Sequence, residues 1–152
     1  MFYRQEVEYL GLIIKPNHIA IDPTKLKGIL EWPLPKKPKD IHQFLGFCGF
    51  YRKFIQGYSQ ITRLLEKLKQ VKAIWGWSKE AQQAFDTLKE HFSNPSMLLV
   101  PDKTKPFILE TDASLKVWGA VLRQYDYNGE LKAYSYLSKA FNPTKKNYQI
   151  YD

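Results

Sequence analysis

Apolar residues near the start of the chain follow a strand pattern and then a helix pattern. Residues 7–14 are mostly apolar and end on two isoleucines, which predicts a strand, and residues 19–21 predict a short return strand. Asp22 followed by Pro23 is typical of a helix start, because an aspartate caps free N–H groups and proline suits the first helical position. A short helix is therefore expected to run to about Trp32.

Three further helices are expected in the middle of the chain. Apolar side chains recur at i, i+3, i+4 and i+7 from Ile41 to Ile55, which places them on one helical face, with Asp40 as the cap. Ser59 is expected to cap the next helix. Ser78 is expected to cap the third, which the Asn-Pro pair at 94–95 ends.

The pattern changes to strands after Met97. The expected elements are strands at 107–112, 118–124 and 131–137, a tight turn at Asn128-Gly129 and a helix after residue 142. The whole pattern predicts an α+β fold, in which a small hairpin and helices precede an antiparallel meander.

The composition narrows the class of protein. The single cysteine, Cys48, excludes an intrachain disulfide and a cysteine-based zinc cluster. No apolar run approaches the roughly 20 residues that span a bilayer. The first residues lack a signal-peptide pattern, so an intracellular location without membrane attachment is expected.

The charge is concentrated in the first part of the chain. The net charge is +8, and residues 1–70 carry 12 Lys and Arg against 6 Asp and Glu. Basic charge among aromatic residues suits a nucleic-acid backbone, and a solubilising surface is the alternative that charge alone leaves open. The candidate phosphate-binding residues are Lys36, Lys37, Lys39, Arg52, Lys53 and Arg63.

Aromatic residues in the helical region have two interpretations. Phe44, Phe47, Phe50, Tyr51 and Phe54 are expected in the helix core and the helix–helix interface, in preference to a base-stacking stripe. Cys48 is expected to be a small core residue. Trp75 and Trp77 are expected to pack where two parts of the chain meet.

Asp112 is the candidate metal-binding residue, because it lies at the end of a hydrophobic strand and small residues follow it. Some nucleases place a metal ligand in this way. Glu110 lies two residues earlier and would share the strand face, although a surface carboxylate is the simpler interpretation of it. Two-metal hydrolysis needs several carboxylates, so Asp112 alone is expected to bind Mg²⁺ weakly.

Several motifs in a fixed order resemble a known family. They are Trp-Pro-Leu-Pro with Lys-Pro at 32–38, Gln-Phe-Leu-Gly-Phe at 43–47, Tyr-Arg-Lys-Phe-Ile at 51–55, Trp-Ser at 77–78, Ala-Phe and Leu-Lys within 84–89, Pro-Asp at 101–102, Pro-Phe, Leu and Thr-Asp-Ala-Ser within 106–114, and Gly-Ala-Val-Leu at 119–122. Over essentially the whole chain they resemble the Pol proteins of Ty3/gypsy-type long-terminal-repeat retrotransposons, and more distantly retroviral reverse transcriptases.

The resemblance implies a domain layout. Residues 1–21 would be the end of the palm, with Tyr9, Leu10 and Gly11 in the hairpin that grips the primer. Residues 22–70 would be the thumb, residues 71–96 a connecting helix, and residues 97–152 the first part of a ribonuclease H-like domain, an incomplete antiparallel meander. Asp112 would be the first of four acidic Mg²⁺ ligands.

Departures from the family pattern limit the activity that is expected. The paired polymerase aspartates are missing, and the family's second ribonuclease H ligand would follow Asp152. A reverse transcriptase/ribonuclease H fragment that is inactive alone is the first hypothesis, with an RNA–DNA or DNA duplex as partner.

Two alternatives remain open. One is a domesticated, non-catalytic module that binds nucleic acid or protein, and the other is a fragment that completes a split enzyme in trans. Because the meander is incomplete, an unpaired edge and exposed apolar surface are expected, with marginal stability and either self-association or binding to the rest of the polymerase and ribonuclease H.

Overall fold

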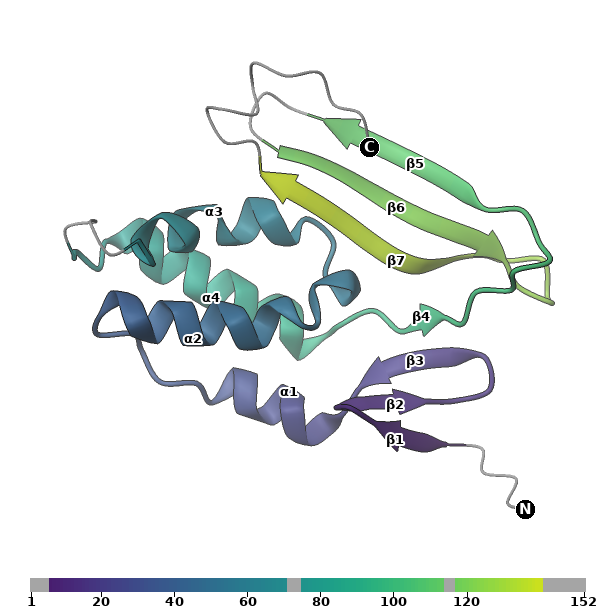
Figure 1. Cartoon of the computed structure of the whole chain (residues 1–152), viewed down its shortest axis with the longest axis horizontal. Helices are drawn as coiled ribbons and strands as arrows, with labels where there is room; N and C mark the ends of the chain where they lie inside the picture. Colours follow the sequence, from purple (N-terminus) through teal and green to yellow (C-terminus); the bar gives the residue numbers. More distant parts are fainter. Residues whose placement is uncertain (1–5, 71–74, 114–116, 141–152) are drawn as a thin grey trace.

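The structure, a computed structural model, describes residues 6–70, 75–113 and 117–140. Helices lie on one side of the molecule and two antiparallel sheets on the other (Figure 1). The first sheet has the order β1-β2-β3-β4, and the second has the order β5-β6-β7. This mixture of helices and antiparallel sheets is the α+β fold that the sequence predicts.

The elements have the following bounds. The strands are β1 (Val7–Tyr9), β2 (Leu12–Ile14), β3 (His18–Ile21), β4 (Leu98–Leu99), β5 (Ile108–Ala113), β6 (Val117–Tyr125) and β7 (Leu131–Ala140). The helices are α1 (Pro23–Leu30), α2 (Pro38–Gly49), α3 (Tyr58–Leu68) and α4 (Lys79–Ser93), with a 3₁₀ turn η1 (Arg52–Phe54). None of the described helices is both long and apolar enough to cross a membrane.

The single strand predicted at residues 7–14 is wrong, because the chain reverses there. Leu10 and Gly11 have φ values of 52° and 78°, and they turn β1 back along β2. Positive φ at both central residues is the geometry of the tight hairpin turn that matches strand twist. The apolar leucine hid this turn, since such turns usually carry Asn or Gly.

Two predicted helix starts are confirmed. The Asp22 carboxylate accepts a hydrogen bond from the Thr24 amide at 3.0 Å, and α1 begins at Pro23. The Ser78 hydroxyl accepts one from the Ala81 amide at 3.0 Å. α1 ends at Leu30, slightly before the predicted limit.

Two other predicted caps are wrong. α2 begins at Pro38, so Asp40 lies in the first turn, where its carboxylate accepts a hydrogen bond from the Lys36 amide at 2.9 Å. Gly57, with a φ of 72°, precedes α3, and Ser59 lies inside the helix. The predicted continuous helix to Ile55 is also interrupted, since α2 ends at Gly49 and η1 follows.

One hydrophobic core joins the helices to the first sheet. The buried residues at its centre include Ile29, Ile41, Phe44, Cys48, Phe54, Leu65, Phe85, Leu88, Phe92 and Leu98. The predicted core positions of Phe44, Cys48, Tyr51 and Phe54 are confirmed, and Phe47, Trp75 and Trp77 pack against this core. Phe50 is the exception, because 57% of it is exposed.

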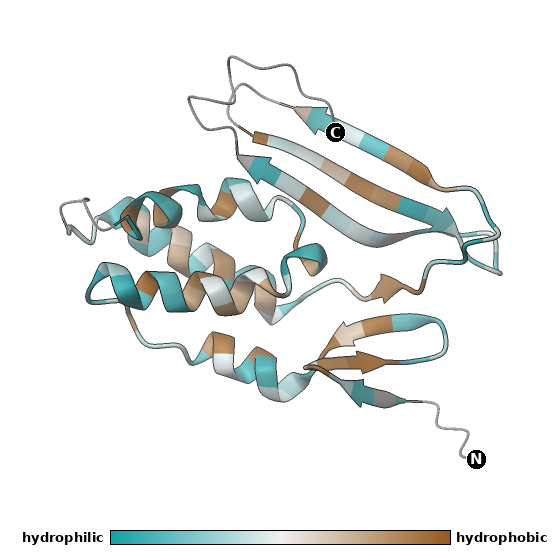
Figure 2. Ribbon diagram, viewed as in Figure 1, coloured by the Kyte–Doolittle hydropathy of each residue, from teal (hydrophilic) through white to brown (hydrophobic). Residues whose placement is uncertain are grey.

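The meander turns where predicted, at Asn128-Gly129. Gly129 has a φ of 78° between β6 and β7, at the Asn-Gly pair. Among the described residues β5 pairs only with β6, so its other edge has no partner strand there. Leu109 and Leu137 are exposed apolar residues on this sheet. Hydrophobic stretches alternate with hydrophilic ones along its strands (Figure 2). Self-association stays a prediction, and the predicted helix after residue 142 lies outside the described residues.

Candidate carboxylate groove and nucleic-acid interface

Strand register places Asp112 on one face of the second sheet. Asp112 pairs with Gly119 on β6, and Gly119 pairs with Ser138 on β7. Residues directly opposite one another in an antiparallel sheet share a face. The side chains of Asp112 and Ser138 therefore point to the same side, with only a glycine between them.

The Asp112 face of the sheet is the face that meets α3. The Ser59 amide of α3 donates a hydrogen bond to the Ser138 hydroxyl at 2.9 Å. α3 lies along the end of β7 where this contact is made (Figure 1). The strand register and this contact together orient Asp112 toward the helical part of the molecule.

A groove of about 570 Å³ separates α3 from the Asp112 edge of the sheet. We call it the Asp112 groove. Its polar and charged lining residues are Gln56, Gln60 and Arg63 from the α3 side and Glu110, Thr111, Asp112, Arg123, Tyr136 and Ser138 from the sheet. Of the predicted site residues, the groove brings together Asp112 and Arg63, which are far apart in sequence.

Charges in the Asp112 groove are partly compensated. Arg123 Nε lies 3.4 Å from Glu110 Oε1, so these two side chains form an ion pair, and Glu110 is exposed, as expected for a surface carboxylate. Arg63 is half-buried, and within the described part of the chain no side chain pairs with it. Asp112 is exposed.

The sequence predicts weak Mg²⁺ binding at Asp112. Mg²⁺ is normally held by several oxygen ligands. Among residues 6–70, 75–113 and 117–140, no group of three or more His, Cys, Asp or Glu side chains comes together. Glu110 shares the face of Asp112, but Arg123 neutralises it. The described residues on their own therefore do not fit a two-metal site.

Arg52, predicted to contact phosphate, fastens the helices to the second sheet. Its guanidinium donates hydrogen bonds to the Ser138 carbonyl at 2.8 Å and to the Ser59 hydroxyl at 3.1 Å. The same guanidinium lies 5.2 Å from the Tyr58 ring centroid. Because these contacts occupy the guanidinium, we leave Arg52 out of the proposed phosphate-binding surface.

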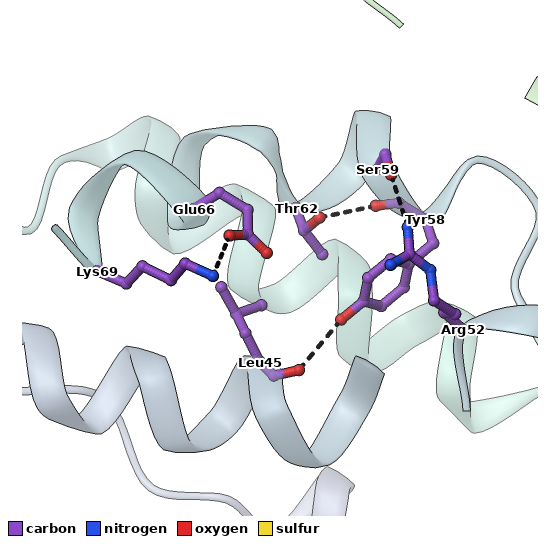
Figure 3. Close-up of polar contacts among 7 residues, drawn as sticks. All are labelled: Leu45, Arg52, Tyr58, Ser59, Thr62, Glu66 and Lys69. Atoms are coloured by element: carbon purple, nitrogen blue, oxygen red, sulfur yellow. Dashed lines mark hydrogen bonds and ion pairs between the residues drawn. The ribbon is translucent and has the colours of Figure 1, made fainter. Parts of the chain in front are cut away.

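Tyr58 anchors this junction from the helical side (Figure 3). Its hydroxyl donates to the Leu45 carbonyl at 3.4 Å, and its own carbonyl accepts from the Thr62 hydroxyl at 3.0 Å. Burial raises the pKa of the Tyr58 hydroxyl well above its ordinary value, so it stays protonated as a donor.

The hairpin tip lies against the end of α2. A Cβ atom at Gly11 would lie closer to the Tyr51 hydroxyl than real Cβ atoms essentially ever come, so a larger residue there would require the Tyr51 side chain to shift. Tyr9 and Leu10 are 59% and 67% exposed, and the Phe50 ring lies 4.9 Å from the Tyr51 ring. Tyr9, Leu10 and Phe50 thus give the hairpin tip an apolar surface.

Two carboxyl groups, those of Glu8 and Asp22, lie close together near the turn of the same hairpin. A hydrogen bond with Asp22 and the negative charge of Asp22 raise the pKa of the Glu8 carboxyl group above its ordinary value. Burial and the Asp22 charge likewise raise the pKa of the Tyr51 hydroxyl. The two acidic side chains therefore interact most favourably when Glu8 is protonated.

The remaining predicted basic residues lie at opposite ends of α2. Lys36, Lys37 and Lys39 surround its start, and Lys53 follows its end in η1. A helix of 12 residues is about 18 Å long, so these lysines form two separate groups. The structure does not bring all the predicted residues into one patch.

Sequence patterns missed several residues of the Asp112 groove. Gln60 and Arg123 were overlooked because only tertiary packing and strand register bring them to Asp112. Glycine inside a strand often marks a place where another group approaches closely, but a Cβ atom at Gly119 would meet only the Leu137 carbonyl oxygen at 3.7 Å, which is an ordinary contact.

Comparison with known proteins assigns the chain to a family. Residues 77–152 match the family described as "RNase H-like domain found in reverse transcriptase". This half of the chain contains Asp112 and the β5-β6-β7 meander. The chain belongs to this family of RNase H-like domains.

The relatives of this chain are retroelement Pol polyproteins. It is 38% identical over 148 residues to the Retrovirus-related Pol polyprotein from transposon 297 of Drosophila melanogaster. This alignment covers 97% of this chain and 14% of that protein. It is 31% identical over 151 residues to the Transposon Tf2-3 polyprotein of Schizosaccharomyces pombe, covering 99% and 11%. The chain thus spans a small part of the length of these relatives.

A solved structure shows the same fold. A foamy viral protease-reverse transcriptase, solved in complex with dsDNA, superposes on this chain with a TM-score of 0.79 at 22% sequence identity. The match covers 96% of this chain and 30% of the viral chain. The same viral protein solved with an RNA/DNA hybrid gives a TM-score of 0.78 at 23% identity. The likeness extends through both the helical part and the second sheet.

Proposed function

We propose that this chain is the duplex-binding part of a retroelement reverse transcriptase/ribonuclease H. In this proposal residues 22–70 serve as the thumb, and the duplex is an RNA–DNA hybrid or DNA. The observation that carries it is the fold match over 96% of the chain to a viral reverse transcriptase solved with dsDNA and, in a second structure, with an RNA/DNA hybrid.

The charge distribution supports the proposal. Lys36, Lys37 and Lys39 are exposed at one end of α2, and Lys53 lies at the other. Lysines spaced along a surface can neutralise successive phosphates, which makes affinity depend steeply on salt. The exposed apolar tip, Tyr9 with Leu10, lies beyond the second end and would contact the same duplex.

A titration of a fluorescent RNA–DNA hybrid with the chain, at two salt concentrations, tests the proposal. Replacing Lys36, Lys37 and Lys39 together by Gln should weaken binding and lower the salt slope by about 2–3. The matched control replaces three exposed lysines elsewhere, Lys79, Lys103 and Lys105, by Gln. Absence of binding at low salt would refute the proposal.

We further propose that Asp112 contributes to hydrolysis with Mg²⁺ only when other carboxylates join it. The described residues supply one unpaired carboxylate at the groove, whereas two-metal hydrolysis uses several. A cleavage assay on an RNA–DNA hybrid with Mg²⁺ should therefore show no turnover by the chain alone. Cleavage that Asp112→Asn abolishes would overturn this part of the proposal.

A further inference from the structure

We propose that the lysine-rich segment between α1 and α2 is a recognition signal for a nuclear-import receptor. The segment reads Pro-Lys-Lys-Pro-Lys at residues 35–39, and we call it the basic segment. The ligand that it fits is a protein groove with carboxylates on both walls. This inference goes beyond the proposed function, because it gives one surface of the helical part a second partner, which is a protein.

All three lysines of the basic segment are free to meet a partner. Lys36, Lys37 and Lys39 are exposed, and none of the ion pairs among the described residues involves them. The Asp40 carboxylate accepts a hydrogen bond from the Lys36 main-chain amide, so it holds the backbone there. Short lysine-rich segments are typical either of nuclear-import signals or of nucleic-acid contacts, so the geometry of the segment has to distinguish the two partners.

Prolines hold the basic segment in an extended conformation. Lys37 has a φ of −157° and a ψ of 164°, as expected for a residue that precedes a proline. Pro35 is buried and Pro38 is the first residue of α2, so the segment is anchored at both ends. A partner therefore meets lysines on a backbone that is already ordered, which lowers the entropy lost on binding.

The extended backbone directs Lys36 and Lys37 to different sides. Successive side chains of an extended chain alternate in direction. A duplex approaches from one side, so its phosphates can contact only one of these two lysines directly. A groove with carboxylates on both walls can engage both lysines through charge-assisted hydrogen bonds, and Lys39 adds a third charge in the first turn of α2. This geometry favours an acidic protein groove as the partner that uses the two adjacent lysines together.

Binding of the full, nuclease-treated chain to a purified nuclear-import adaptor, measured by anisotropy, tests the inference. Lys36→Gln and Lys37→Gln should each weaken this binding about tenfold, because each removes a charge-assisted hydrogen bond. Lys53→Gln, the loss of one charge beyond the other end of α2, should stay within about twofold of wild type. Melting curves establish that each variant is folded.

A cellular readout accompanies the binding measurement. The chain fused to a passenger protein too large to diffuse through nuclear pores should accumulate in the nucleus. The double variant Lys36→Gln/Lys37→Gln should leave the fusion in the cytoplasm, and Lys53→Gln should not. Nuclear accumulation that persists in the double variant would overturn the inference.

Competition separates this partner from the duplex. An excess of the RNA–DNA hybrid should release the chain from the adaptor, because both partners use the basic segment. Wild-type chain that binds the hybrid but not the adaptor, or adaptor binding that Lys36→Gln and Lys37→Gln leave unchanged, would overturn the inference while the proposed function stands. Adaptor binding that depends on these lysines, without any binding of the hybrid at low salt, would support the inference and overturn the proposed function.

Discussion

The Ser59 amide and the Ser138 hydroxyl are joined by a buried hydrogen bond of 2.9 Å, although 79 residues separate them in sequence. This bond connects the start of α3 to the end of β7. Arg52 adds its own bonds to both residues. This junction is one of the contacts that hold β7, and with it the Asp112 sheet, against the helical part.

Removing the Arg52 guanidinium should loosen this junction. Arg52→Gln is expected to lower the free energy of unfolding by about 1–3 kcal/mol, because it removes charge-assisted hydrogen bonds to a carbonyl and a hydroxyl. Urea denaturation measures the change. Lys39→Gln, an equal loss of charge at an exposed position on α2, should cost less than about 0.5 kcal/mol. Equal effects of the two variants would contradict a stabilising role of the Arg52 hydrogen bonds at this junction.

Gly11 offers a comparison with a second glycine of the same conformation. Gly11 and Gly129 both have a φ of 78°, so alanine should cost about 1–2 kcal/mol at either position. Only at Gly11 would the new Cβ collide with Tyr51, whereas nothing lies near it at Gly129. Gly11→Ala should therefore destabilise more than Gly129→Ala in thermal melts.

The collision itself can be relieved by a second substitution. Adding Tyr51→Phe to Gly11→Ala removes the hydroxyl that the Cβ would meet. The double variant should recover the part of the stability that the collision removes. The part that alanine loses because of the positive φ at position 11 should remain lost. No recovery would mean that backbone strain alone accounts for the loss.

Glu8 should make the docking of the hairpin depend on pH. Its pKa is raised in the folded chain by the hydrogen bond and the charge of Asp22. Its contribution to stability is therefore complete below the unfolded pKa and is lost as pH rises through the folded value. Amide hydrogen exchange of residues 7–14 should show weaker protection at neutral pH than near pH 4, after correction for intrinsic exchange rates.

Glu8→Gln is the matched variant for this effect, because glutamine resembles the protonated acid in shape and hydrogen bonding. The variant should keep hairpin protection nearly independent of pH across the same range. Glu31→Gln, at an exposed position that follows α1, should leave the pH dependence as in wild type. A pH dependence that persists in Glu8→Gln would exclude Glu8 as its origin.

The amide of Gln124 should be needed for the loop that leads into β5. The side chain is 1% exposed, and its oxygen accepts from the Asp102 amide at 2.8 Å while its nitrogen donates to the Asp102 carbonyl at 2.7 Å. Gln124→Leu leaves these main-chain groups without that partner, at about 1–3 kcal/mol each. Urea denaturation should show the loss, and Gln83→Leu at an exposed position of α4 should not.

Local signals account for much of the fold. The caps at Asp22 and Ser78 and the turn at Gly129 were predictable, because each depends on residues close in sequence. The turn at Leu10 could not be predicted from the hydrophobic pattern, since its apolar residues resemble a continuing strand, and only the family resemblance placed Leu10 in a hairpin. Helix starts at Pro38 and Tyr58 were misplaced because polar residues nearby offered equally plausible caps.

The candidate site was less predictable than the fold. Asp112 was identifiable from its motif, but its neighbours depend on register across three strands and on how α3 packs. Arg52 looked like a surface cation because nothing local reveals its bonds to Ser138. Phe50 looked like a core residue because it follows the apolar helical face, yet α2 ends before it.

The short strand β4 has a consequence for the order in which the chain folds. Leu98 and Leu99 complete the first sheet by pairing with Ile19 and His18 of β3. During synthesis some eighty further residues must therefore be added after β3 before β4 can pair with its free edge. Long-range pairing of this kind is slow. Because β4 leads into the second sheet, the edge of the first sheet is completed by the segment that immediately precedes the strand carrying Asp112.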